Sequence, residues 1–269
     1  MTTPVITLLT DYGTASEFPG VCHGVIRRIV PEAAIVDITH SIVRHDVRHG
    51  ALVLRNTLEY MPVGVHIAVV DPQVGTERRG VAVRCDNGRI LVGPDNGVLA
   101  LAIDLAGGAV EAADISRSRH RLEPVSATFH GRDVFAPVGA ALASGAELAE
   151  AGDPIDVASL SGLELPRPRR EGDVVIAHAL LVDVYGNVTL DITHEDLPDT
   201  GLHYGRALEV SAGGRSRRAT FAGTFADVPA GDLLLYEDGS RMLALAVNRG
   251  DAATDLAVRA DSELRLTPL

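Results

Sequence analysis

Lysine is absent from this sequence, so all 24 of its basic residues are arginine, and tryptophan is absent as well. A P-loop needs a lysine on the phosphates, and pyridoxal chemistry needs a lysine that forms a Schiff base. Aromatic residues make up 4% of the chain, which leaves little material for stacking on nucleobases. The formal net charge of −12 repels a phosphate backbone. These absences exclude P-loop and pyridoxal enzymes and argue against nucleic acid as a partner.

Cysteine is also scarce. Cys22 and Cys85 lie far apart with no paired spacing, which argues against a disulfide framework or a zinc ribbon and is typical of a reducing cytoplasm. The longest apolar runs have the length of strands, far below the roughly 20 residues of a membrane-spanning helix. The N-terminus lacks the basic start and long apolar segment of a signal peptide. We therefore expect a cytoplasmic protein with no membrane partner.

The first part of the chain alternates between strand-like and helix-like patterns. Apolar runs at 5–10, 34–38 and 65–70 predict strands, and the apolar spacing at 18–30 and about 47–60 predicts helices between them. This repetition is typical of an α/β domain with a parallel sheet.

A polar segment with two prolines, Leu163–Asp173, marks a change of pattern. We place the first domain at residues 1–164, a linker at 165–172 and a second domain at 173–269. In the second domain, short β-rich runs separated by glycine-containing turns predict a small antiparallel sandwich or barrel.

Several polar residues stand where α/β proteins carry their chemistry. Asp11 and Asp71 each follow a predicted strand, and ligands of open α/β sheets bind beyond the carboxyl ends of the strands. Arg78 follows Asp71 in a loop that proline and glycine can fix. His130 precedes a predicted helix, which Asp133 is expected to cap. Each residue also has an ordinary interpretation as a turn former, a surface ion pair or a cap.

Common metal and cofactor motifs are missing. His40, His45 and His49 lie close in sequence, but no carboxylate pattern of the metalloprotease type accompanies them, so we expect no metal site. No Gly-x-Gly-x-x-Gly loop follows the first strand, and no Gly-x-Ser-x-Gly elbow is present. We therefore expect no cofactor.

Seven short motifs run in a fixed order through nearly the whole chain. They are Thr10-Asp11-Tyr12-Gly13, Asp37-Ile38-Thr39-His40, Val69-Val70-Asp71-Pro72 with Gly75-Thr76-Glu77-Arg78, Gly93-Pro94-Asp95-Asn96-Gly97, Phe129-His130-Gly131-Arg132-Asp133, Asp183-Val184-Tyr185-Gly186-Asn187 and Ala246-Val247-Asn248-Arg249-Gly250. In this order they resemble the S-adenosyl-L-methionine hydroxide adenosyltransferases, which are relatives of the fluorinase and chlorinase enzymes.

The resemblance implies an N-terminal α/β/α sandwich with a mainly parallel sheet, a C-terminal antiparallel β-barrel and a homotrimer. It places the active site between the N-terminal domain of one subunit and the C-terminal domain of a neighbour. The implied reaction is the hydrolysis of S-adenosyl-L-methionine by water or hydroxide at C5′, which gives adenosine and L-methionine. By this resemblance, Asp71, Arg78 and His130 match the family's water-activating triad.

Three further residues match substrate contacts of the family. Asp11 matches the residue that holds the ribose hydroxyls, Asp183 a contact to the methionine amino group, and Asn187 a contact to adenine.

Two positions favour water over halide as the nucleophile. The halogenases carry an aromatic residue where this chain has Asp71, and the fluorinase carries serine where it has Gly131. Gln73 replaces a usual glycine, and the turn around Ser240 does not align cleanly with the family. The alternatives are a halide-dependent 5′-halogenase, a non-catalytic protein that binds S-adenosyl-L-methionine or adenosine, and a methyltransferase, which the missing glycine loop disfavours.

Overall fold

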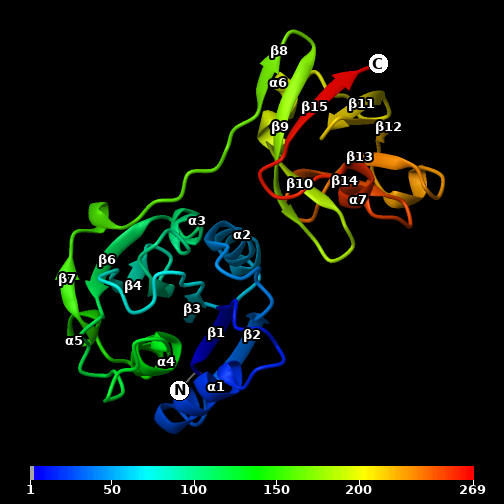
Figure 1. The fold of residues 1–269 in the computed structure, drawn as a ribbon. Helices are drawn as coiled ribbons and strands as arrows, with labels where there is room; N and C mark the ends of the chain where they lie inside the picture. The colour runs from blue at the N-terminus through cyan, green and yellow to red at the C-terminus, as the bar shows by residue number, and fades with distance from the viewer. Residues whose placement is uncertain (1–2) are drawn as a thin grey trace. The chain divides into compact units, whose positions relative to one another are not determined.

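The computed structural model describes residues 3–269, which divide into two compact units, one up to Leu163 and one from Glu164 to Leu269 (Figure 1). Residues 164–168 have no regular secondary structure, and β8 (Arg169–Glu171) falls within the stretch predicted as a linker.

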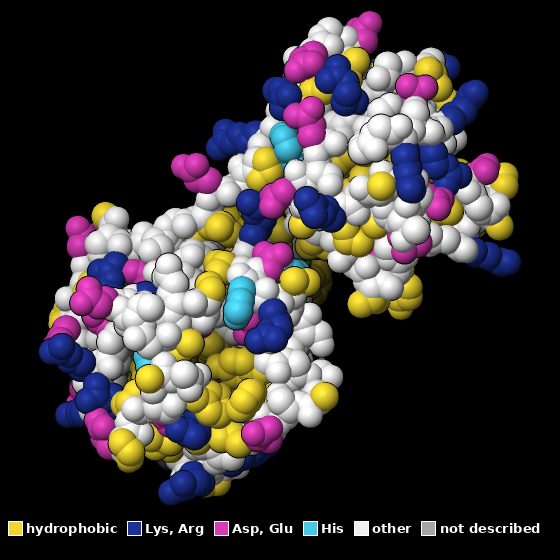
Figure 2. Space-filling view, viewed as in Figure 1, with side chains coloured by type: hydrophobic (Ala, Val, Ile, Leu, Met, Phe, Trp, Pro, Cys, Tyr) yellow, Lys and Arg dark blue, Asp and Glu magenta, His cyan; other side chains and the backbone are white. Residues whose placement is uncertain are grey.

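In the described part of the chain, no helix combines the length and the apolar character that crossing a bilayer requires. Acidic and basic side chains are interspersed over the face seen in Figure 2, so this face carries no broad field of one sign.

A seven-stranded sheet in the order β2-β1-β3-β5-β4-β6-β7 organises the first unit. Its strands are β1 (Val5–Thr10), β2 (Ala34–Thr39), β3 (Val65–Val69), β4 (Gly80–Cys85), β5 (Ile90–Pro94), β6 (Ala109–Asp114) and β7 (Asp153–Ile155). β2, β1, β3 and β5 pair in parallel, whereas β4, β6 and β7 join the sheet through antiparallel pairs. β6 again runs in the direction of the parallel set, so most strands share one direction, as predicted.

Helices cover both faces of this sheet (Figure 1). One face carries α1 (Phe18–Ile29), the π-helical turn η1 (Gly131–Phe135), α4 (Ala136–Ala143) and α5 (Leu148–Ala151), and the other carries α2 (Val47–Leu58) and α3 (Ala100–Leu105). Side chains of β3 alternate between the layers: Ile67 packs with the first set of helices and Ala68 with the second. A short 3-10 turn, η2 (Val157–Ser159), completes the unit. The α/β/α sandwich is therefore confirmed.

Helix α1 illustrates how the local sequence sets an element. Pro19 stands in its first turn, where the missing N–H has no intrahelical partner to lose. Cys22, Val25 and Ile26 form one buried stripe, spaced as a helix requires. Pro31 lies just beyond the helix end and cannot continue it. The buried stripe holds α1 against the first core of the unit.

The second unit is a closed β-barrel. Its strand order is β10-β14-β13-β12-β11-β15-β9, closed by pairing of β10 with β9 and extended by β8. Its elements are β9 (Val174–Val182), β10 (Val188–Thr193), η3 (His194–Asp196), α6 (Leu197–Thr200), β11 (Ala207–Ala212), β12 (Arg215–Phe221), η4 (Phe225–Asp227), β13 (Leu233–Glu237), β14 (Met242–Val247), α7 (Ala252–Leu256) and β15 (Glu263–Pro268). β12 and β13 pair in parallel, and the other neighbours pair antiparallel. The predicted choice between sandwich and barrel is thus resolved as a barrel.

The parallel register places two aspartates on one edge of the first sheet. Thr10, the last residue of β1, lies opposite Val69, the last residue of β3. The chain therefore leaves these neighbouring strands on the same edge, at Asp11 and at Val70-Asp71. This carboxyl edge is where open α/β sheets bind ligands.

Candidate active site

Asp71, Arg78 and His130 meet in one contact cluster. Arg78 Nε donates to both carboxylate oxygens of Asp71, at 2.9 and 3.0 Å, and Arg78 Nη2 also donates to Asp71 Oδ2. The same Nη2 lies 2.9 Å from Nδ1 of His130. The side chains of Asp71 and Arg78 are each 6% exposed. The cluster is therefore a largely desolvated carboxylate–guanidinium pair, with an imidazole against a guanidinium nitrogen that also contacts Asp71, rather than a surface ion pair.

The loop after β3 turns the chain back so that Arg78 reaches Asp71. Val74 N donates to Asp71 O, and Thr76 N donates to Gln73 O, so the loop is folded on itself. Gly75 takes a φ of +82°, and a Cβ at this position would lie 2.4 Å from the Ala127 carbonyl oxygen. Glycine is therefore required at position 75 by both conformation and space. Gln73, which departs from the family pattern, contributes its backbone carbonyl to this turn, and its side chain is exposed.

His130 is placed by the π-helical turn η1, which was not predicted. Asp133 lies within this turn, is 1% exposed, and accepts hydrogen bonds from Ser126 N at 2.7 Å and Arg132 Nε at 2.6 Å. The expectation that Asp133 caps the helix is wrong, because its carboxylate holds the preceding loop and Arg132 instead. Asp133 therefore stabilises the segment that carries His130. π-helical turns recur at functional sites.

The surroundings of His130 favour its neutral form. Burial lowers the pKa of His130, and the neighbouring Arg78 cation lowers it further, while Asp71 and Asp133 oppose the shift. A guanidinium can only donate hydrogen bonds, so Nδ1 accepts from Arg78, and the proton of the neutral ring lies on Nε2. The surroundings thus favour the neutral ring, and the contact with Arg78 sets its tautomer.

A cavity of about 1000 Å³ lies beside this cluster, a size typical of small-molecule sites. Asp11, Asp71 and His130 line it, together with an aromatic group. In that group, Tyr12, Phe18 and Phe129 pack edge to face, with ring centroids 4.9–5.8 Å apart. The cavity thus joins an apolar aromatic wall to a small number of charged groups.

Asp11 lies in the wall of this cavity, at the end of β1. Its Oδ2 accepts a hydrogen bond from the backbone N of His45 at 2.9 Å, and His45 holds a left-handed φ of 65°. The backbone therefore fixes the orientation of the carboxylate. A carboxylate held in this way is suited to accept hydrogen bonds from ligand hydroxyls.

Gly131 fits tightly against Tyr12. A Cβ at position 131 would lie 2.1 Å from the Tyr12 hydroxyl oxygen, so any larger residue requires the ring to move. Burial raises the pKa of Tyr12 well above its usual value, so this hydroxyl stays protonated at neutral pH. The position at which the fluorinase was expected to carry serine is therefore closed to a side chain here unless Tyr12 shifts.

Asp183 and Asn187 lie together in the turn between β9 and β10 of the second unit. Asn187 Nδ2 donates to Asp183 Oδ2 at 2.8 Å, and Asp183 Oδ1 accepts from the backbone N of Tyr185 and of Asn187. Val184 and Tyr185 at the tip are 95% and 75% exposed. Asp183 thus organises a turn that presents an apolar tip. Asp183 and Asn187 thus contact each other within the second unit. The other predicted site residues lie in the first unit: Asp11, Asp71, Arg78 and His130.

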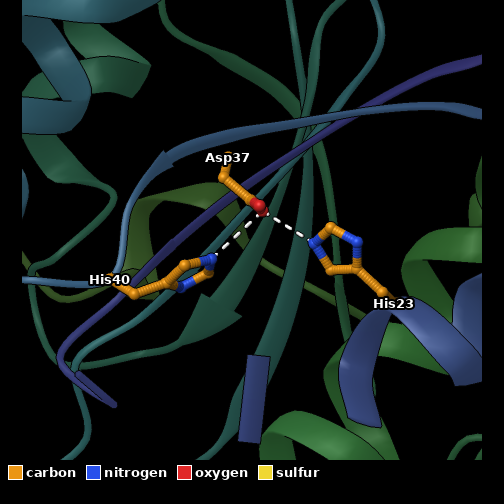
Figure 3. A group of neighbouring side chains, drawn as sticks. All are labelled: His23, Asp37 and His40. Carbon is orange, nitrogen blue, oxygen red and sulfur yellow. Dashed lines mark hydrogen bonds and ion pairs between the residues drawn. The ribbon is translucent and has the colours of Figure 1, made fainter. Parts of the chain in front are cut away.

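The histidines grouped by sequence spacing do not come together as metal ligands in the described part of the chain, although His40 and His45 both line the cavity. His49 Nδ1 accepts from Val43 N at 3.2 Å, while His45 contacts Asp11 through its backbone. His40 instead lies near His23 and Asp37, a grouping that the sequence did not predict, because it brings a residue of α1 to the end of β2 (Figure 3). Neither the His23–Asp37 interval nor the Asp37–His40 interval by itself signals this arrangement.

The fold and the cluster define a class: a protein with an α/β/α domain, a charged Asp–Arg–His cluster at a ligand-sized cavity, and a C-terminal β-barrel. Sequence profiles of the N-terminal and C-terminal domains of the S-adenosyl-L-methionine hydroxide adenosyltransferases match residues 6–152 and 177–265. The chain therefore belongs to this family.

Individual relatives agree with this assignment. The chain is 46% identical over 268 residues to an (R)-S-adenosyl-L-methionine hydrolase of Salinispora arenicola, with 98% of each chain covered. A fluorinase of Actinoplanes is more distant, at 26% identity, with 98% of this chain and 97% of the fluorinase covered. Among solved structures, an uncharacterized conserved protein of Thermotoga maritima superposes with a TM-score of 0.89 at 36% identity, covering 97% of this chain and 99% of that one.

Proposed function

We infer that this protein hydrolyses S-adenosyl-L-methionine to adenosine and L-methionine. The observation that carries the inference is the Asp71–Arg78–His130 cluster beside a ligand-sized cavity. It occurs in a chain that is 46% identical to a relative named (R)-S-adenosyl-L-methionine hydrolase. The sulfonium of the substrate is already a good leaving group, so the chemical difficulty is to activate water. We propose that the reaction uses no metal and no cofactor.

The proposed step is a displacement at C5′. The water oxygen forms a bond to C5′, the C5′–S bond breaks with its electron pair going to sulfur, and one proton leaves the water. We place the reacting water between Arg78 and His130, where it takes over their 2.9 Å hydrogen bond. It would accept from Arg78 Nη2 and donate to His130 Nδ1, whose lone pair then takes the proton.

Each member of the cluster has a distinct role in this proposal. The Arg78 cation stabilises the developing hydroxide. Asp71 holds the guanidinium by its fork and keeps it in place when the contact with His130 opens. The lowered pKa of His130 keeps its Nδ1 lone pair available at neutral pH. Fixing the water in line with C5′ adds the benefit of proximity.

Substrate contacts are proposed from the family pattern. Asp11 would bind the ribose hydroxyls, which its position in the cavity wall supports. Asp183 would contact the methionine amino group and Asn187 the adenine. Because the family places these two residues at a neighbour's active site, we propose a homotrimer. The unpaired, buried cysteines support a reducing compartment such as the cytoplasm.

A halide-dependent 5′-halogenase is the second candidate, because fluorinases are among the relatives. Two features favour water instead. Position 71 is an aspartate paired with Arg78, and a carboxylate there repels a halide ion. Position 131 is a glycine packed against Tyr12, which leaves no room for a serine hydroxyl without rearrangement.

The test is a turnover assay with product identification. Purified protein is incubated with S-adenosyl-L-methionine, with and without added chloride or fluoride, and products are separated by chromatography. Equal amounts of adenosine and methionine, unaffected by halide, support the proposal. A 5′-halo-5′-deoxyadenosine would assign the halogenase. Substrate that stays bound and intact would assign a binding protein.

A further inference from the structure

Three side chains outside the proposed catalytic cluster converge at the edge of the first sheet. His23 lies in α1 and Asp37 in β2, and His40 is the residue just beyond the end of β2. In Figure 3 the Asp37 carboxylate points between the two imidazole rings. Its Oδ1 lies 2.8 Å from His23 Nε2 and 3.1 Å from His40 Nε2, and one donor atom from each residue lies within 4.8 Å of the others. Two imidazole nitrogens and one carboxylate oxygen therefore face a common point.

The His40 ring is buried and held from behind. Its side chain is 8% exposed, and its Nδ1 lies 2.9 Å from the hydroxyl oxygen of Thr10. Its Nε2, on the cluster side, makes no hydrogen bond of acceptable geometry to any of residues 3–269, despite its closeness to Asp37. The Asp37 carboxylate gives His23 Nε2 a hydrogen-bond partner, but it leaves the buried Nε2 of His40 without one. Such an atom is costly to bury without a partner.

A metal ion would give His40 Nε2 a partner. The distances from Asp37 Oδ1 to the two imidazole nitrogens are also close to the distances between ligands of a bound ion. Nitrogen and oxygen ligands about 2.0–2.1 Å from a tetrahedral Zn²⁺ lie about 3.3–3.4 Å from one another. The separations of 2.8 and 3.1 Å would have to open by a few tenths of an ångström. The side chains of His23 and Asp37 are 34% and 42% exposed, so both can move and the point they face is accessible from solvent.

We propose that His23, Asp37 and His40 form a binding site for a divalent transition-metal ion, with Zn²⁺ as the best-matched ion. Imidazole suits Zn²⁺ and its neighbours in the transition series, whereas Mg²⁺ and Ca²⁺ prefer sites made of oxygen. The Thr10 hydroxyl orients the His40 ring, as groups behind metal-binding histidines commonly do. Three protein ligands leave a position for water.

The site is separate from the proposed reaction but adjoins the cavity. None of its three ligands belongs to the Asp71–Arg78–His130 cluster, whereas His40 lines the cavity and its carbonyl oxygen accepts from Gly13 N at 2.7 Å. A bound ion would join α1 to the end of β2 and to the loop after Asp11. The expectation of no metal site weighed His40 with His45 and His49, and not with the residues that the fold brings to it.

The test is calorimetric titration of chelator-treated protein with Zn²⁺, with Mg²⁺ titrated in parallel. We expect one Zn²⁺ per chain, an increase in thermal midpoint that grows with Zn²⁺ concentration, and no binding of Mg²⁺. His23→Asn and Asp37→Asn should each weaken Zn²⁺ binding more than about tenfold. Thr10→Val should weaken it roughly 10- to 100-fold, because its hydroxyl supports His40 from behind.

The matched control is His194→Asn. His194 lies 2.6 Å from Glu237 on the second unit, so it is an exposed histidine–carboxylate pair outside the cluster. This variant should bind Zn²⁺ as the wild type does, and far-UV circular dichroism verifies that every variant is folded. Absence of Zn²⁺ binding by the wild type, or equal affinities for His23→Asn and His194→Asn, would overturn the proposal.

Discussion

Arg78 is the residue whose replacement separates charge from geometry in the proposed mechanism. Arg78→Lys keeps a cation but loses the fork that binds both oxygens of Asp71 and reaches His130. Arg78→Met loses the charge as well. Loss of one preorganised donor to a developing anion typically costs 10²–10³ in kcat, about 2.7–4 kcal/mol. We therefore expect kcat to fall at least roughly 10²-fold in Arg78→Lys and further in Arg78→Met.

The two variants should differ in pH dependence. Arg78 is one of the causes that lower the pKa of His130, second to burial. Without the cation this pKa rises, so the acidic limb of the kcat/KM profile should move to higher pH in Arg78→Met. The shift should be smaller in Arg78→Lys, which retains a positive charge. The profile is measured from initial rates of adenosine formation.

The free energy of unfolding is the control that separates a loss of kcat from a loss of folded protein. Removing one partner of a buried ion pair costs about 3–5 kcal/mol, and Asp71 and Arg78 are each 6% exposed. Arg78→Met should therefore lower the free energy of unfolding by a few kcal/mol, and assays must be run below its thermal midpoint. Near wild-type kcat in a folded Arg78→Met protein would refute the role given to the guanidinium.

Three further predictions concern other parts of the first unit, and the first of them has a matched control. Gly131→Ala should lower the free energy of unfolding by about 1–3 kcal/mol, because its Cβ would lie 2.1 Å from the Tyr12 hydroxyl. Gly24→Ala, in α1 with nothing within 4 Å of its Cβ, should be neutral or stabilising in the same melts; a similar loss in both would contradict the packing argument. Asp11→Asn should lower kcat/KM roughly ten- to hundredfold by weakening a charged hydrogen bond, and unchanged kinetics would remove Asp11 from the site. Burial lowers the pKa of His66 from its usual 6.5 to about 4. As the pH falls, His66 is therefore protonated in the unfolded chain before it is protonated in the folded protein. The free energy of unfolding consequently decreases as the pH drops from 6.5 to about 4. At about 1.4 kcal/mol per pH unit this loss is about 3 kcal/mol, and denaturant titrations should find it reduced in His66→Leu. An unchanged slope in that variant would contradict this assignment.

The sequence predicted the features that depend on local periodicity and parallel pairing. The strands at 5–10 and 65–70 and the helices between them are present, because their apolar patterns match their burial. The meeting of Asp71 with Arg78 follows from a loop of few residues whose proline and glycine limit its path. The prediction that His130 joins Asp71 and Arg78 came from the resemblance to the family.

Other features depend on contacts that no local pattern encodes. The π-helical turn Gly131–Phe135 and the buried role of Asp133 arise because Asp133 reaches the Ser126 backbone. The parallel pairing of β12 with β13 requires a connection whose direction the turn residues do not specify. The convergence of His23 with Asp37 depends on how α1 packs beside β2, which is a tertiary contact. Each of these is set by packing between segments rather than by propensity.

Isotope labelling of the reaction tests hydrolysis at C5′ most directly. S-adenosyl-L-methionine is incubated with the protein in H₂¹⁸O, and both products are examined by mass spectrometry. We predict adenosine that carries one ¹⁸O at its 5′ hydroxyl and methionine without label. Label-free adenosine, or consumption of the substrate without formation of adenosine, would contradict attack of water at that carbon.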